Sequence, residues 1–206
     1  MEATTTKIIV ILGTAHGSNV PGKCSPDKKF REYKFSREVI AMLKPRLEAV
    51  GFTVFVDMPN DEVPRPGNTE LSLRCKFVNR ICAKFGKDNC VYVSIHVNAA
   101  GSDGQWHDAR GFAVYVARSC SAVSKQLAKT FCDLAISRGL RGNRSVPSAH
   151  YWQANFYVLR NTACPAVLTE NLFQDNRDDV EFLSSEKGKE AIATLHLDAI
   201  KSLFAK

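Results

Sequence analysis

Long apolar runs are missing from the start of this chain of 206 residues. Its N-terminus, MEATTTKIIVILG, is acidic and then polar, with a short apolar run only from Ile8 to Leu12. A membrane span needs about 20 apolar residues, and the core of a signal peptide needs roughly 7–15. We therefore expect a protein made in the cytoplasm without a signal peptide and without membrane insertion.

The sequence has no CxxC pair, although it contains seven cysteines. Cysteines at that spacing are typical of thiolate zinc sites and thioredoxin-like redox sites, so both classes are disfavoured. Several cysteines lie in apolar stretches such as NCVYV and KTFCDLA. They are predicted to be free thiols in a core, which suits folding in a reducing compartment.

Linkers, internal repeats and low-complexity tracts are also absent, so residues 1–206 are expected to form a single domain with 1–6 as a flexible tail. The net charge is +7. The basic residues are scattered and interrupted by acids, which argues against nucleic acid as a partner. The charge suits a polyanionic surface such as a cell envelope instead, and we expect a monomer.

Strand-like and helical patterns alternate along the chain. Strands are predicted at residues 7–13, 52–57, 91–96, 111–117 and 166–170, and helices at 31–50, 68–86, 121–139 and 185–205. Pro45 predicts a kink or a restart in the first helix. The alternation predicts an α/β fold in which helices cover both faces of a twisted, mostly parallel sheet.

Four residues with acid-base or metal-binding side chains fall at informative places. His16, His96 and Glu170 each follow or end a predicted strand, and the carboxyl ends of parallel strands share one edge of a sheet. Glu32 lies three residues before Phe35, so it continues the buried stripe of its helix, where a carboxylate needs a partner. Two histidines and a carboxylate form many catalytic zinc sites, which leaves Glu170 as a general base.

Each of these residues also has an ordinary explanation, and the sequence contains no HExxH motif. His16 could hydrogen-bond within a glycine-containing loop, and His96 could be a satisfied core histidine. Glu32 could be a first-turn acid favoured by the helix dipole, and Glu170 could cap the following turn. Spacing alone does not decide between these interpretations.

Four motifs together bear a closer resemblance. ILGTAHGSN is a strand leading to a His-Gly loop, and Glu32 begins a helix that ends at Gly51 before the strand FTVFV. SIHVNA contains His96, and VLRNTACPAVLTEN contains Glu170. In content and order these motifs resemble the zinc-dependent N-acetylmuramoyl-L-alanine amidases of the amidase-3 family, which cleave bacterial peptidoglycan.

The resemblance extends from about residue 7 to residue 206. It implies Zn²⁺ bound by His16, Glu32 and His96, with Glu170 as the catalytic residue. The implied reaction is hydrolysis of the amide between N-acetylmuramic acid and L-alanine. The compact, basic chain resembles a phage or prophage endolysin that another protein releases to the cell wall. A chain whose signal has been removed is the alternative.

One departure from the family lies in the first motif. The family usually has Asp-Pro-Gly-His-Gly, where this chain has Gly13-Thr14-Ala15-His16-Gly17. We expect the missing acid to weaken the orientation of the first ligand or its loop. The segment ENLFQDN also differs from the residues that follow the catalytic glutamate in the family. We therefore expect the surface that contacts substrate beside Glu170 to differ as well.

Weaker candidates for substrate contact are Asn98, His150, Trp152 and Arg160. Trp152 could equally be a partly buried anchor, and Arg160 could be half of a structural ion pair. Two other functions stay open at this point. One is a zinc peptidase that cuts within peptidoglycan stem peptides, and the other is a non-catalytic envelope-binding module.

Overall fold

The structure is a computed structural model that describes residues 8–64 and 66–204, so the predicted tail at residues 1–6 lies outside it. A single six-stranded sheet has the order β2-β1-β3-β6-β4-β5. The strands are β1 (Ile9–Thr14), β2 (Thr53–Val56), β3 (Cys90–Asn98), β4 (Ala113–Val116), β5 (Trp152–Gln153) and β6 (Ala166–Phe173). The prediction of a mostly parallel sheet is confirmed, because β1, β2, β3 and β6 run parallel and β4 runs antiparallel to β6.

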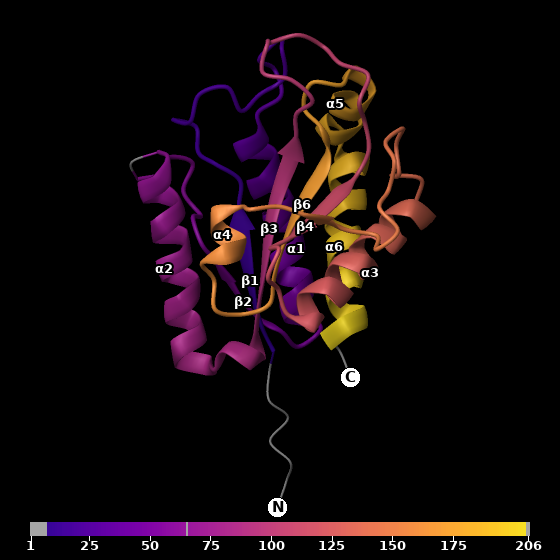
Figure 1. The fold of residues 1–206 in the computed structure, drawn as a ribbon. Coiled ribbons are helices and arrows are strands. Elements are labelled where there is room, and N and C mark those ends of the chain that lie inside the picture. The colour runs from indigo at the N-terminus through magenta and orange to yellow at the C-terminus, as the bar shows by residue number, and fades with distance from the viewer. Residues whose placement is uncertain (1–7, 65, 205–206) are drawn as a thin grey trace, which may run out of the picture.

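Helices cover both faces of this sheet, as predicted (Figure 1). They are α1 (Glu32–Ala49), α2 (Asn68–Phe85), α3 (Ala122–Ser137), α4 (Tyr157–Arg160), α5 (Arg177–Ser184) and α6 (Glu186–Phe204), with a 3-10 turn at Lys87–Asn89. Alternate side chains of each strand enter two apolar clusters. One cluster packs against α1, α3 and α6, and the other packs against α2 and α4. Within the described residues, no helix has both the length and the apolarity needed to cross a bilayer.

The sequence patterns missed four short elements, and one expected break does not occur. Strand β5, the 3-10 turn, α4 and α5 have two, three, four and eight residues, fewer than the roughly 11–18 over which a helical repeat is recognised. The side chain of Asn176 nevertheless caps α5 by accepting a hydrogen bond from the Asp179 amide at 3.1 Å. Helix α1 continues through Pro45 from its first residue to its last.

All seven cysteines are free thiols, and five of them are buried. Cys90 and Cys132 occupy the core from β3 and α3 with 2% of their surface exposed. The cysteines of the apolar stretches therefore pack as small core residues, as predicted.

His196 of α6 is a core histidine, with no exposed surface. Its Nδ1 lies 2.8 Å from the Ile192 carbonyl, and its Nε2 lies 2.9 Å from Thr169 Oγ1. A carbonyl can only accept, so Nδ1 donates, and in the neutral ring Nε2 accepts from the threonine hydroxyl. Burial lowers the pKa of His196 from 6.5 to about 4.

The buried His196 ring predicts how the free energy of unfolding changes at acid pH. Between pH 6.5 and 4 the unfolded chain binds a proton at His196 that the folded chain does not, so stability falls as the pH falls. His196→Gln should destabilise the protein at pH 7.5, and this deficit should shrink by about 2–3 kcal/mol at pH 4.5. Urea unfolding at the two pH values measures it. The control Ile200→Val should show the same deficit at both, and a pH-independent deficit for His196→Gln would refute the role of the ring.

Candidate metal centre and active site

Three of the predicted residues converge at the carboxyl ends of β1 and β3. Ligand atoms of His16, Glu32 and His96 all lie within 4.8 Å of one another. His16 Nε2 is 3.5 Å from Glu32 Oε2, and His96 Nδ1 is 3.0 Å from Glu32 Oε1. The two imidazole rings meet edge to face with centroids 5.1 Å apart. One carboxylate therefore lies between two imidazoles, and all three can face one ion.

His16 is presented by the loop that follows β1, in a left-handed backbone conformation with φ of 38°. This conformation is unfavourable for a non-glycine residue and needs support from its surroundings. Guanidinium groups of Arg37 and Arg74 donate to the His16 carbonyl at 3.1 and 3.2 Å. The amide of Ala15 donates to Ser36 Oγ on α1 at 2.9 Å. Side chains from α1 and α2 thus hold the ligand loop in place.

Glu32 is the first residue of α1, and its side chain is buried. Its Oε1 also accepts from the Val97 amide at 3.1 Å. Burial acts against its charge, but the hydrogen bond from His96 and the charges of both histidines leave its pKa below the ordinary value. The Glu32 carboxyl group is therefore ionised at neutral pH.

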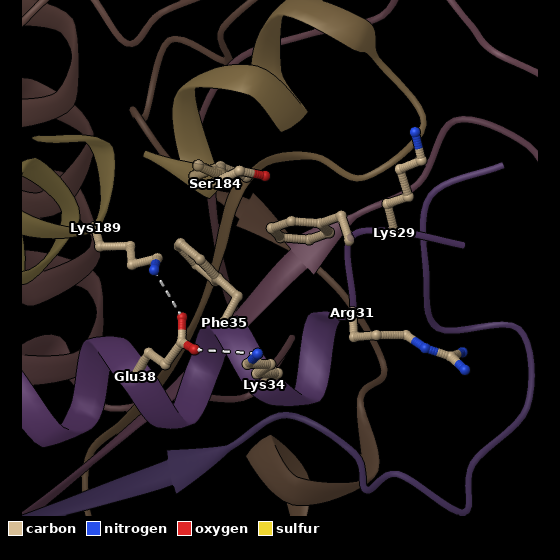
Figure 2. A pocket seen from close by; sticks show the side chains of 9 residues that line it. Lys29, Arg31, Lys34, Phe35, Glu38, Ser184 and Lys189 are labelled. Atoms are coloured by element: carbon tan, nitrogen blue, oxygen red, sulfur yellow. Dashed lines mark ion pairs between the residues drawn. The ribbon is translucent and has the colours of Figure 1, made fainter. Parts of the chain in front are cut away.

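Contacts between α1 and α6 fix the helix that carries Glu32. A hollow of about 160 Å³ lies between α1 and the α5–α6 junction, and Figure 2 shows the side chains that line it. There the Glu38 carboxylate lies 3.0 Å from Lys189 of α6 and 3.9 Å from Lys34. Phe35 is buried beside these ion pairs. The ion pair between Glu38 and Lys189 therefore ties α1, which carries Glu32, to α6.

His16 is partly buried, and this desolvation lowers its pKa from 6.5 to about 3. A neutral imidazole keeps a lone pair free for a metal, so the ring is in the correct form for binding at neutral pH. His96 Nε2 lies 3.1 Å from Ser94 Oγ, and Asn171 donates to the His96 carbonyl at 2.9 Å. These contacts orient the second imidazole from outside the cluster.

Glu170 lies beside His96, because the two are register partners on β3 and β6. Its other register partner is Ala113 of β4. Glu170 Oε2 is buried and has no hydrogen-bond partner among the described residues. Burial, followed by the charge of Glu32, raises the pKa of Glu170 well above its ordinary value. A carboxyl group in this state can accept and return a proton near neutral pH.

The first motif lacks the family's aspartate, but the carboxylate of Asp57 contacts the same motif from the end of β2. Asp57, directly after β2, accepts from the Thr14 amide at 3.0 Å and from Arg74 Nη1 at 2.8 Å. The Tyr92 hydroxyl donates to its other oxygen at 2.8 Å. Glu70 accepts from Arg74 Nε at 2.7 Å, which completes a buried network. The first ligand loop is thus anchored despite the departure in its motif.

The four weaker candidates separate into two groups. Asn98 ends β3 at an irregularity in its pairing with β6, and Trp152 lies on β5 with its ring 6.0 Å from that of Tyr115. Asn98 is on the site's end of the sheet, and the Trp152 ring shares the Arg144 guanidinium with Phe173 of that end. His150 instead pairs with Asp133 of α3, and Arg160 lines a hollow at the opposite end of β3, beside Cys90. We therefore exclude His150 and Arg160 from the proposed site.

The sequence patterns missed the supporting residues Ser36, Arg37, Arg74 and Ser94. Only Ser94 had a usable signal, since it lies two residues before His96 and so faces the same side of the strand. The others are polar positions on α1 and α2, and only the packed structure shows that they turn inward.

Two histidines and a carboxylate that could hold a metal ion, with a partnerless carboxylate oxygen beside them at the carboxyl edge of a sheet, are an arrangement typical of metal-dependent hydrolases. The chain belongs to the N-acetylmuramoyl-L-alanine amidase family, whose sequence profile matches residues 10–202. The resemblance of the four motifs is thereby confirmed.

Individual relatives agree with this family. An endolysin of Bacillus phage SPP1 is 33% identical over 121 residues, which are 55% of this chain and 40% of that protein. A sporulation-specific N-acetylmuramoyl-L-alanine amidase of Bacillus subtilis is 24% identical over 200 residues, which are 95% of this chain and 68% of that protein. The aligned part of this chain thus spans less than half of the phage endolysin.

Solved structures share the fold. The crystal structure of an N-acetylmuramoyl-L-alanine amidase from Clostridium difficile 630 superposes with a TM-score of 0.78 at 23% identity. The alignment covers 96% of this chain and 97% of that chain. The likeness extends over the whole sheet and its helices.

Proposed function

We propose that this protein is a zinc-dependent N-acetylmuramoyl-L-alanine amidase. It hydrolyses the amide between the lactyl group of N-acetylmuramic acid and L-alanine in peptidoglycan. The observation that carries the proposal is the buried Glu32 carboxylate between His16 and His96, with the partnerless oxygen of Glu170 on the adjacent strand. Family membership and the names of the relatives support the substrate.

The donor set fits zinc. Two imidazoles and one carboxylate are a common catalytic ligand set, in which a fourth position stays open. Imidazole and carboxylate ligands both suit Zn²⁺, and the absence of a cysteine from the cluster of described residues disfavours an iron–sulfur or Cu(I) site. Zn²⁺, when bound by His16, Glu32 and His96, supplies a Lewis acid that acidifies a water molecule and polarises the amide carbonyl.

The chain's own residues then move the proton. Glu170 takes a proton from the attacking water as the new carbon–oxygen bond forms. It returns this proton to the leaving nitrogen as the carbon–nitrogen bond breaks. The products are the lactyl carboxylate and a stem peptide with a free L-alanine amine. Ser94 and the anchors of the His16 loop keep the ligands in place through the cycle.

A digest of purified peptidoglycan, read by mass spectrometry, tests the reaction. We expect stem peptides with a free N-terminal L-alanine from the zinc-loaded protein and none after removal of the metal with a chelator. His16→Ala should lose both the bound zinc and the activity. His107→Ala, which changes a partly exposed loop histidine outside the cluster, should keep one zinc per chain.

Two other outcomes of the digest would contradict the proposal. Fragments cut inside the stem peptide would identify a zinc peptidase with the same metal site. Bound zinc without release of any fragment, from intact wall or from soluble muropeptides, would identify an envelope-binding module.

A further inference from the structure

One buried nitrogen near the site has no partner within the chain. Arg144 Nη1 is buried and makes no hydrogen bond to any described residue. Buried polar atoms in folded proteins are almost always hydrogen-bonded, so an unpaired donor calls for an explanation. For a guanidinium group the matching partner is a carboxylate, which it binds through two parallel hydrogen bonds.

The Arg144 guanidinium is held between two aromatic rings. Its central carbon lies 5.4 Å from the centre of the Trp152 ring and 5.3 Å from that of Phe173. Cation–π contacts of this kind fix a planar guanidinium and reduce the side-chain entropy lost when a ligand binds. The group is therefore preorganised without being neutralised.

The loop that carries Arg144 is also fixed. Asn143 accepts from the Arg110 amide at 3.0 Å and donates to the Asp108 carbonyl at 2.7 Å. The loop that carries Arg144 crosses the segment that ends at Gly111. The two backbones lie so close that a Cβ atom added at Gly111 would be 2.3 Å from the Arg141 carbonyl oxygen. Arg144 therefore projects from a supported backbone.

Arg144 lies on the Glu170 side of the site. Phe173, against which it packs, is three residues beyond Glu170 on β6. The positive charge of Arg144 also acts on the Glu170 carboxyl, against the effect of burial. When the scissile amide of a substrate reaches Glu170, the substrate groups next to that amide therefore lie near Arg144.

We propose that Arg144 binds a carboxylate of the stem peptide on the amine side of the scissile bond, and so determines specificity. This inference rests on the proposed amidase function. In a stem peptide the first carboxylate beyond that amide is the α-carboxylate of the D-isoglutamyl residue that follows L-alanine. Some stem peptides carry an amide at this position, and such an amide cannot make the charged pair.

A matched pair of substrates tests the proposal. The zinc-loaded protein is given disaccharide-tetrapeptide muropeptides with either a free or an amidated D-isoglutamyl α-carboxyl, and kcat/KM is measured for each. Wild type should prefer the free carboxylate by ~10- to 100-fold, the range expected for a hydrogen bond to a charged group. Arg144→Ala should bring this ratio close to one, and Arg144→Lys should leave an intermediate preference.

The ratio is measured on one enzyme sample, so a loss of correctly folded protein cancels. Arg141→Ala, at an exposed arginine of the same loop, should keep the wild-type preference. An equal rate on both substrates by wild type, or a preference that survives in Arg144→Ala, would overturn the role of Arg144. Cleavage of neither substrate by zinc-loaded wild type would instead overturn the proposed reaction.

Discussion

Glu170→Gln is expected to reduce kcat by about 10²–10⁴ while zinc stays bound. The amide has nearly the same shape as the carboxyl group but cannot take a proton from water. The residue lies outside the three proposed metal ligands, so the zinc content should remain one per chain. Hydrolysis of soluble muropeptides, together with metal analysis of the same sample, measures both quantities.

The same variant should not be less stable than wild type. Glu170 Oε2 has no hydrogen-bond partner among the described residues, and burial disfavours its charge. Replacement by a neutral amide removes that cost. We expect an unchanged or higher unfolding temperature, with Glu181→Gln on the exposed side of α5 as the control. Wild-type turnover in Glu170→Gln would show that the general base is another group.

Arg74→Leu is expected to cost about 3–5 kcal/mol of folding stability, because it leaves two buried carboxylates without their cation. The side chains of Arg74, Asp57 and Glu70 are each at most 4% exposed. Burial opposes the charge of Arg74, but its carboxylate neighbours raise its pKa above the ordinary value. Denaturant unfolding of the zinc-free protein measures the loss.

An exposed ion pair supplies the comparison. Arg46→Leu removes the partner of Glu190 on α6, and half-exposed pairs of this kind contribute at most about 1 kcal/mol. Arg74→Leu should also weaken zinc binding by ~10- to 100-fold, because Arg74 holds the His16 carbonyl. A stability loss below that of Arg46→Leu would show that the network is not a structural anchor of the site.

Much of the metal site could be predicted because its residues break local patterns. Glu32 interrupts an apolar stripe, and the two histidines fall where strands end, so each was conspicuous without any knowledge of packing. The resemblance to the family then joined residues that are remote in sequence. These are features that periodicity and strand order determine directly.

The supporting network could not be predicted, because its residues follow local patterns. Glu70 and Arg74 have the spacing of an ordinary surface ion pair on a helix. Their burial depends on where α2 meets the end of β2, which no local pattern specifies. The position of Arg160 could not be predicted for a related reason, since α4 places it beside Cys90 at the opposite end of the sheet.

Because β4 runs antiparallel to β6, the proposed metal ligands and the loops beside the substrate come from different halves of the sheet. Every ligand of the proposed metal site comes from the parallel half, where strand order and helix packing constrain it. Because β4 and β5 run the other way, the connections at residues 99–112 and 138–151 arrive at the same edge from the antiparallel half. Surface connections tolerate changes of length and composition. Substrate choice can therefore change in evolution through these two loops, while the chemistry remains in a scaffold that they do not build.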